Sequence, residues 1–433
     1  MRFSKRIALV SIAVYLTSNN IHVAAGQQDR VPDNPAVLTR VGDRVIKVND
    51  AIRMVLGFGN TFMVTTPDGN VIIDTSIAAH ARVHHRLLRS ESSAPTRYII
   101  LTHAHGDHTG GVPLWKEPGT QIIAQRNHVE FAHYQARLGE FFARRNAAQF
   151  GAGIARPVPP AVGNYGGRIE PTVLFDDKHE FTLGGVKFEV YRTPGETADH
   201  VTVWIPQYRV AFSGDNYYES FPNIYTLRGT PPRRALDYVN SLNFILGLKP
   251  EIVLPSHGGP IIGNADITTR LTRYRDAILY VHDETVKGMN AGKDVYTLMR
   301  EIKLPAALDV GESYGKLSWS VRGIYEGYIG WFDLNPATMY ETPASAIYPD
   351  LVKLAGGPDA VVKLANERVN AGQPVEALRL TDVVLEGEAG NKAALETRLK
   401  ALEILVSRCK NTNERGWLDY SIRTTKAKLS ERR

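Results

Sequence analysis

The sequence has a single cysteine, Cys409, among 433 residues. No intrachain disulfide can form, and a zinc site built on cysteine is excluded. Any bound metal must therefore be held by histidine, aspartate or glutamate. A secreted chain without disulfides has to depend on a large core, and 43% hydrophobic residues are enough to build one.

Long apolar runs are also scarce. The one candidate, Ile7–Leu16, is ten residues long, whereas a membrane-spanning helix needs roughly 20. Basic residues precede this run and small residues follow it up to Ala25, an order typical of a secretory signal. We expect residues 1–25 to be a signal peptide, with a membrane anchor as the alternative. The mature protein is then secreted or periplasmic and has no membrane span.

Dense clusters of lysine and arginine interleaved with aromatic residues are absent, so nothing indicates nucleic-acid binding. The formal net charge of +6 falls to +3 when residues 1–25 are removed, because that segment holds three basic residues and no acidic ones. A local cationic pocket for a small anion is compatible with this balance.

The length exceeds the roughly 250–300 residues at which single cores stop growing, so we expect two domains after the signal. Residues 40–264 alternate strand and helix patterns and begin with a β-meander between Val45 and Ser76, which indicates a mixed sheet in an α/β domain. The segment Gly151–Gly167, rich in Gly and Pro, is typical of a long exposed binding loop. Further strands are expected at Arg97–Leu101, Ile122–Ala124, Val186–Arg192, Val201–Ile205, Val210–Phe212 and Ile252–Leu254.

Strand signals fade after Gly263, and residues 265–430 are predicted to be helical. Between Asp266 and Asn290 apolar residues recur at helical spacing. Gly, Pro or Asn delimit three more helix candidates. These are Asp359–Ala371, Pro374–Glu386 and Asn391–Arg408.

Metal-ligating residues are concentrated directly after the expected strand Arg97–Leu101. His103 and His105 alternate along an extended stretch, and Asp107 and His108 follow at the turn. Four strong ligands within six residues can serve two adjacent metals, which together could activate water for hydrolysis.

Each of two such metals would need one more ligand from later in the chain. Glu196, Asp215 and His257 all stand where predicted strands end, which is where ligands gather in α/β sheets. His200 is an alternative to Glu196. Other histidines are expected at surface or core positions in helix- or loop-like segments, namely His84, His85, His128, His133 and His179.

The motif His103-Ala104-His105-Gly106-Asp107-His108 resembles that of the metallo-β-lactamase superfamily. Glu196, in place of the third histidine of most members, is similar to the alkylsulfatase branch, and so is the 19-residue spacing to Asp215. The resemblance implies an αββα sandwich and two metal ions, with zinc as the default and iron or manganese as alternatives. It assigns His103, His105 and Glu196 to the first metal, Asp107, His108 and His257 to the second, and Asp215 to both. Asp107 and Asp215 are also the predicted catalytic carboxylates.

The segment Phe221–Gly229 looks like the sulfate-binding segment of that branch, which implies that Asn223, Thr226 and Arg228 contact the sulfate. A planar guanidinium and short hydrogen-bond donors suit a tetrahedral oxyanion. Residues 265–430 resemble the branch's dimerisation domain, for example at Gly330–Ala337, and imply a homodimer.

Three departures from the branch are expected to matter. Asp215 replaces the usual bridging glutamate and has a shorter arm. Ser318-Trp319-Ser320 stands where the branch has Ser-His-Asn, so a proposed proton donor is missing. We also expect the lipid-carrier-like C-terminal domain of the longer alkylsulfatases to be absent.

The leading hypothesis is a binuclear metal hydrolase that cleaves sulfate esters of alkyl or other small organic alcohols by attack of a metal-bound hydroxide. The runner-up is a hydrolase of the same fold acting on a phosphodiester, a lactone or a β-lactam. A third hypothesis is a catalytically silent dimer that binds a small anion or a lipid.

Overall fold

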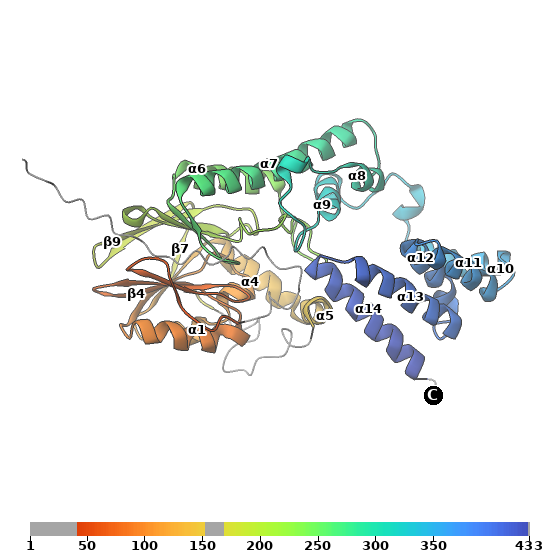
Figure 1. Ribbon diagram of the computed structural model, residues 1–433, viewed down its shortest axis with the longest axis horizontal. Helices are drawn as coiled ribbons and strands as arrows, with labels where there is room; N and C mark the ends of the chain where they lie inside the picture. The colour runs from red at the N-terminus through yellow and green to blue at the C-terminus, as the bar shows by residue number, and fades with distance from the viewer. Residues whose placement is uncertain (1–40, 152–168, 432–433) are drawn as a thin grey trace, which may run out of the picture. The chain divides into compact units, whose positions relative to one another are not determined.

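The computed structural model describes residues 41–151 and 169–431 (Figure 1). Two β-sheets pack face to face, and helices cover the outer face of each sheet. This is the predicted αββα sandwich, and a helical region follows it in the chain. The predicted signal peptide, residues 1–25, lies outside the described residues, as does the predicted long loop beyond Gly151.

The first sheet has seven strands in sequence order. Its first four strands form the predicted antiparallel meander, and β4 to β7 then run parallel to one another, so the sheet is mixed. The strands are β1 (Ile46–Lys47), β2 (Ile52–Val55), β3 (Thr61–Thr66), β4 (Gly69–Thr75), β5 (Thr96–Ile100), β6 (Gln121–Gln125) and β7 (Val173–Phe175).

The second sheet has six strands in the order β13-β12-β11-β10-β9-β8. Only β11 and β12 are parallel neighbours. The edge strand β8 was not predicted, and His179 lies in this strand rather than in a helix or loop. The strands are β8 (Lys178–Leu183), β9 (Val186–Arg192), β10 (Val201–Ile205), β11 (Val210–Gly214), β12 (Ile252–Pro255) and β13 (Ile261–Ile262).

The space between the sheets is filled by apolar side chains from both, since each strand turns alternate residues inward. Phe62 of β3 and Phe212 of β11 meet edge to face, with ring centroids 5.2 Å apart. Both rings are fully buried, and truncating one such ring to alanine typically costs about 3–5 kcal/mol of stability. This inner core fixes the two sheets against each other, and with them the strand ends that carry polar residues.

Helices close the two outer faces (Figure 1). Leu88 and Trp115 pack on the first sheet, and Tyr238 and Leu242 pack on the second. The helices up to this point are α1 (Ala78–Glu91), α2 (Gly106–Thr109), α3 (Val112–Trp115), α4 (Asn127–Arg137), α5 (Gly139–Phe150), the short 3-10 turn η3 (Pro206–Tyr208) and α6 (Ala235–Gly247).

The remainder of the described chain is helical, as predicted. The predicted helices correspond to α7, α11, α12 and α13, while α8, α9, α10 and α14 were not predicted. None of the described helices is long and apolar enough to cross a membrane. The elements are α7 (Asn264–Asn290), α8 (Val295–Glu301), η4 (Ala306–Leu308), α9 (Leu317–Ile329), η5 (Pro336–Met339), η6 (Ala344–Ile347), α10 (Tyr348–Leu354), α11 (Pro358–Asn370), α12 (Pro374–Gly387), α13 (Lys392–Arg408) and α14 (Thr412–Ser430).

Candidate metal centre and anion pocket

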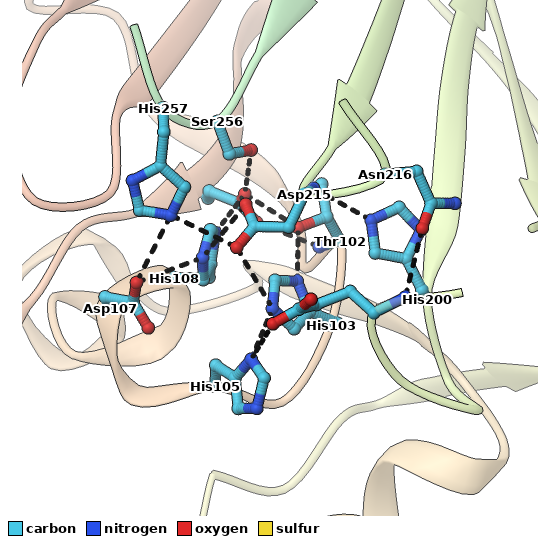
Figure 2. A network of polar contacts seen from close by, with 12 residues as sticks. Thr102, His103, His105, Asp107, His108, His200, Asp215, Asn216, Ser256 and His257 are labelled. Carbon is cyan, nitrogen blue, oxygen red and sulfur yellow. Dashed lines mark hydrogen bonds and ion pairs between the residues drawn. The ribbon is translucent and has the colours of Figure 1, made fainter. Parts of the chain in front are cut away.

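The seven predicted metal ligands meet at one edge of the sandwich, where five of them follow strand ends and Asp107 and His108 lie in the short helix α2. Figure 2 labels all of them except Glu196. They form two groups, and within each group the ligand atoms lie within 4.8 Å of one another. The first group combines His103 and His105, which follow β5, with Glu196 from the loop between β9 and β10. The second group consists of Asp107, His108, Asp215 and His257.

The first group is compact. His103 Nε2 lies 2.8 Å from His105 Nδ1, and His105 Nδ1 lies 3.6 Å from Glu196 Oε1. Burial lowers the pKa of both histidines well below the usual value, which favours neutral imidazoles. Neutral imidazole nitrogens and a carboxylate oxygen are the donors that divalent transition metals prefer.

The second group contains two carboxylates. His257 Nε2 lies 3.1 Å from Asp215 Oδ2 and 3.4 Å from Asp107 Oδ2. His108 Nε2 lies 3.4 Å from Asp107 Oδ2 and 3.5 Å from Asp215 Oδ1. Burial alone would lower the pKa of His108, but the charges of Asp215 and Asp107 outweigh it and raise that pKa. This group therefore attracts positive charge.

Asp215 faces both groups despite its short side chain. Its Oδ2 lies 3.9 Å from His103 Nε2 of the first group as well as close to His257 of the second. Although Asp215 is shorter than the glutamate of the related branch, its carboxylate still lies close to both groups.

The ligand atoms suit a cation because several of them have no hydrogen-bond partner in the described chain. His105 Nε2, His108 Nε2 and Asp215 Oδ1 are buried and have no hydrogen-bond partner among the described residues. A buried polar atom without a partner is costly, and a coordinated metal would remove that cost for His108 and Asp215. The two groups can therefore hold divalent metal.

A buried carboxylate behind the second group, Asp74, was not assigned a role from the sequence. It lies one residue before the end of β4 and accepts hydrogen bonds from the Thr102 hydroxyl at 2.7 Å and the Ser256 hydroxyl at 2.8 Å. Its Oδ2 also lies 2.8 Å from His108 Nδ1. A carboxylate behind a ligand histidine fixes the ring and leaves Nε2 free to bind metal. The apolar run Val71–Ile73, followed directly by Asp74, is the feature of the sequence from which this carboxylate could have been recognised.

Glu196 of the first group is held from behind by two other side chains missed in the sequence. Arg233 and Tyr238 both donate to Glu196 Oε2, the tyrosine at 2.6 Å. The Asn216 side chain accepts the Glu196 backbone N–H at 3.1 Å. This leaves Oε1 turned toward His105. Arg233 follows two prolines, and nothing in the sequence indicated its burial.

His200, the alternative to Glu196, makes a different set of contacts (Figure 2). Its Nε2 accepts the backbone N–H of Asp215 at 3.0 Å, and its Nδ1 lies 3.0 Å from the Thr193 carbonyl oxygen. Both ring nitrogens are thus engaged, and His200 positions Asp215 instead of joining the first group. A side chain at Gly214 would collide with this ring, and Gly214 has a φ of 54°.

The predicted sulfate contacts lie in the irregular segment before α6. Asn223 and Thr226 are buried, and Asn223 Oδ1 and Thr226 Oγ1 have no partner among the described residues. Arg228 lies within electrostatic reach of His105, because its positive charge is among the influences that lower the pKa of that histidine. Arg145 of α5 holds this turn in place by donating to the carbonyl oxygen of Arg228 at 2.6 Å and to that of Leu227.

The segment before α9 supplies a further residue that sequence reasoning missed, Tyr314. Burial, followed by the charge of Asp107, raises its pKa, while Arg228 acts in the opposite direction. The hydroxyl group therefore lies within electrostatic reach of both the metal ligands and Arg228. Trp319, at the family's histidine position, instead lies under Lys316, whose Nζ is 5.5 Å from the ring centroid.

Comparisons with known proteins agree with this geometry. The family model described as metallo-beta-lactamase superfamily matches residues 54–257, and the one described as alkyl sulfatase dimerisation matches residues 296–426. A linear primary-alkylsulfatase of a Pseudomonas species is 29% identical over 390 residues, covering 85% of this chain and 74% of that protein. The chain therefore contains a segment that matches the metallo-beta-lactamase superfamily, followed by one that matches the alkyl sulfatase dimerisation family.

Two further proteins to which the chain is similar are likewise named as sulfatases. An alkyl/aryl-sulfatase of Saccharomyces cerevisiae is 28% identical over 391 residues, covering 83% of this chain and 60% of that protein. The fold also matches the solved structure of a stereoselective inverting sec-alkylsulfatase from Pseudomonas sp., with a TM-score of 0.81 at 24% identity over 89% of this chain and 66% of the other. The chain thus spans less than two thirds of the length of these last two relatives.

Proposed function

We propose that this protein is a sulfuric ester hydrolase that cleaves sulfate esters of alkyl or other small organic alcohols with the help of two zinc ions. The observation that carries the proposal is the pairing of two His/carboxylate groups with an adjacent segment whose buried polar atoms have no partner in the described chain. The similarity to alkylsulfatases over most of the chain supports the same substrate class.

The two groups would share the metal ions as the sequence predicted. His103, His105 and Glu196 would hold one ion, Asp107, His108 and His257 the other, and Asp215 would reach both. Divalent metals in such a site supply an activated water molecule and neutralise negative charge on the substrate. Asp107 and Asp215, whose Oδ2 atoms lie 3.4 Å and 3.1 Å from His257 Nε2, would be the carboxylates that orient that water and take up its proton.

The anion pocket would select the sulfate group. The Arg228 guanidinium, the Thr226 hydroxyl and the NH2 group of the Asn223 amide would donate to sulfate oxygens. The buried Thr226 hydroxyl has no internal partner in the described chain, and a buried donor binds an oxyanion more strongly than an exposed one because no water competes for it. Trp319 cannot protonate the leaving alcohol, and Tyr314 is a hydroxyl-bearing side chain of the same segment whose pKa the charge of Asp107 helps to raise.

Two further parts of the proposal concern assembly and location. The match to the alkyl sulfatase dimerisation family supports a homodimer built on the helical region, which we assign to residues 265–430 after a catalytic domain at 40–264. The order of charges and apolar residues in residues 1–25 supports secretion or a periplasmic location. Sequencing the amino terminus of protein recovered from secreted and periplasmic fractions tests the predicted cleavage after Ala25.

The deciding experiment measures sulfate release from decyl sulfate by the zinc-loaded protein, with Arg228→Ala alongside. We expect metal-dependent release by the unmodified protein and a loss of roughly 100-fold or more in Arg228→Ala, since removing one preorganised donor typically costs that much. Arg234→Ala is the matched control, because this neighbouring arginine is exposed, and it should retain activity.

Metal analysis accompanies the assay. If the protein holds two zinc ions and releases no sulfate from alkyl or aryl sulfates, the sulfatase proposal is wrong. A phosphodiester, a lactone and nitrocefin would then be assayed on the same sample. Less than one metal ion per chain would instead contradict the assignment of the two metal groups.

A further inference from the structure

The amino-terminal turn of α14 contacts residues 311–316, the segment before α9 that contains Tyr314. Asn411, the residue before α14, is buried, and its side-chain amide donates to three backbone carbonyl oxygens of this short segment. These belong to Glu312 at 2.7 Å, Tyr314 at 2.9 Å and Gly315 at 3.1 Å. One side chain thus fixes the backbone on both sides of Tyr314.

Other groups of the same helical turn strengthen this attachment. The Asn413 amide donates to the Tyr314 carbonyl oxygen at 2.9 Å, and the Thr412 backbone N–H donates to the Ser313 carbonyl oxygen at 2.8 Å. Lys316 forms an ion pair with Glu414 at 2.7 Å. The segment is therefore held by α14 through several independent contacts.

The held segment in turn contacts the anion pocket. The Phe221 backbone N–H donates to the Gly311 carbonyl oxygen at 2.7 Å, and the Gly315 backbone N–H donates to the Phe221 carbonyl oxygen at 3.1 Å. A β-carbon at Gly315 would lie 2.2 Å from the carbonyl oxygens of Phe221 and Pro222, so the two backbones touch directly. Asn223 follows immediately in the chain.

The Tyr314 ring packs against Tyr218, which borders the pocket. The two rings meet edge to face with centroids 5.6 Å apart, and the Tyr218 hydroxyl accepts the backbone N–H of Asn223 at 2.7 Å. The Tyr218 ring also lies 6.3 Å from that of His257. The tyrosine pair therefore stands between the second metal group and the anion pocket.

We propose that Asn411 is a positioning residue of the substrate pocket, which holds Tyr314 against Tyr218, beside the anion-binding segment and the second metal group. This inference rests on the proposed function for the identity of the substrate, but the contacts that carry it do not. The carboxy-terminal helix α14 would then help to shape the substrate pocket although it contributes no metal ligand.

The test compares two asparagines that have the same role at a helix start. Asn411 and Asn391 each accept a backbone N–H of their helix with the side-chain oxygen, but the Asn391 amide donates only to exposed Glu388. Serine keeps the capping oxygen and loses the amide donors. Asn411→Ser should lower kcat/KM for decyl sulfate by roughly 10- to 100-fold, because small displacements of a reacting geometry cost that much. Asn391→Ser should change it less than about twofold.

A double-mutant cycle with Tyr314→Phe separates positioning from general loss of structure. If Asn411 acts through Tyr314, the effect of Asn411→Ser on kcat/KM should shrink to about twofold or less when Tyr314 is already phenylalanine. Equal effects of Asn411→Ser in both backgrounds would overturn the proposal. Zinc content should stay the same in all variants.

Two additions keep the test decisive. Glu414→Gln removes the ion pair with Lys316 and leaves Asn411 in place. If Asn411→Ser does not fold, the same cycle is run with Glu414→Gln, and we expect kcat/KM to fall several-fold. Binding of inorganic sulfate to the zinc-loaded protein, measured by calorimetry, supplies a readout without turnover. If sulfate affinity shows coupling between Asn411 and Tyr314 but decyl sulfate is not hydrolysed, the proposed function is wrong and the positioning role is supported. If decyl sulfate is hydrolysed but no coupling is found, the proposed function is supported and the positioning role is wrong.

Discussion

The two metal groups use similar donors but differ in the charge that lies behind them. Behind Glu196 of the first group lies the buried guanidinium of Arg233, whereas behind His108 of the second group lies the buried carboxylate of Asp74. At about 4 Å two unit charges interact by roughly 4 kcal/mol at an effective dielectric constant near 20. The first group is therefore partly neutralised by the protein itself, while the second depends on a cation for its neutralisation.

This contrast implies that the two groups differ in affinity for metal. The second group contains Asp107 and Asp215 and has Asp74 behind it, so it should fill first as metal is added. The first group should fill later, since Arg233 already compensates Glu196. Charge behind a ligand acts on a metal site as strongly as the ligand's own identity.

The largest predicted effect comes from Arg233→Met. Removing one partner of a buried ion pair typically costs about 3–5 kcal/mol, and we expect that loss in the free energy of unfolding of the metal-free protein. With zinc bound the loss should be smaller, because the ion takes over the compensation of Glu196. Chemical denaturation with and without zinc measures both values. Arg234→Met, at an exposed neighbouring position, is the control, and an equal loss in both states would refute this account of the first group.

An intermediate effect is predicted for Asp74→Asn. The amide keeps the size of the side chain but removes the negative charge behind His108, and such changes typically weaken metal binding 10- to 100-fold. Titration with zinc buffered by a chelator should show the tighter of two binding steps weakened and the other little changed. Asp68→Asn, at an exposed turn, should leave both steps in place. A shift of both steps by the same factor would contradict the separation into two groups.

The smallest predicted effect is that of Tyr238→Phe, which removes one hydrogen bond to Glu196 Oε2 and leaves Arg233 in place. Hydrogen bonds to charged groups contribute about 1.5–3 kcal/mol, and we expect the lower end because Arg233 continues to bind the same oxygen. Denaturation of the metal-free protein measures the difference. Tyr274→Phe is the matched control, since that buried hydroxyl pairs with no side chain in the described chain. If both substitutions change stability equally, Tyr238 has no specific role behind Glu196.

Much of the fold could be predicted because its signals are local. The meander, the strands β9 to β12 and the helices α7 and α11 to α13 follow from apolar periodicity and from Gly, Pro and Asn at the ends of elements. The strands β7, β8 and β13 and the helices α8, α9, α10 and α14 were missed. Strand β8 carries polar residues such as His179 on an exposed edge, and the charged, partly exposed α14 has only a narrow apolar face.

The sequence by itself determined the donor set: four ligands are adjacent in the chain, and Glu196, Asp215 and His257 each follow a strand whose end is recognisable. It also indicated the anion segment through its resemblance to a known family. Only the tertiary structure decided what lies behind those residues, because Asp74, Arg233 and Asn411 act across long separations in the chain through burial and single hydrogen bonds. Such contacts depend on how sheets and helices pack, and no periodicity or spacing in the sequence records them.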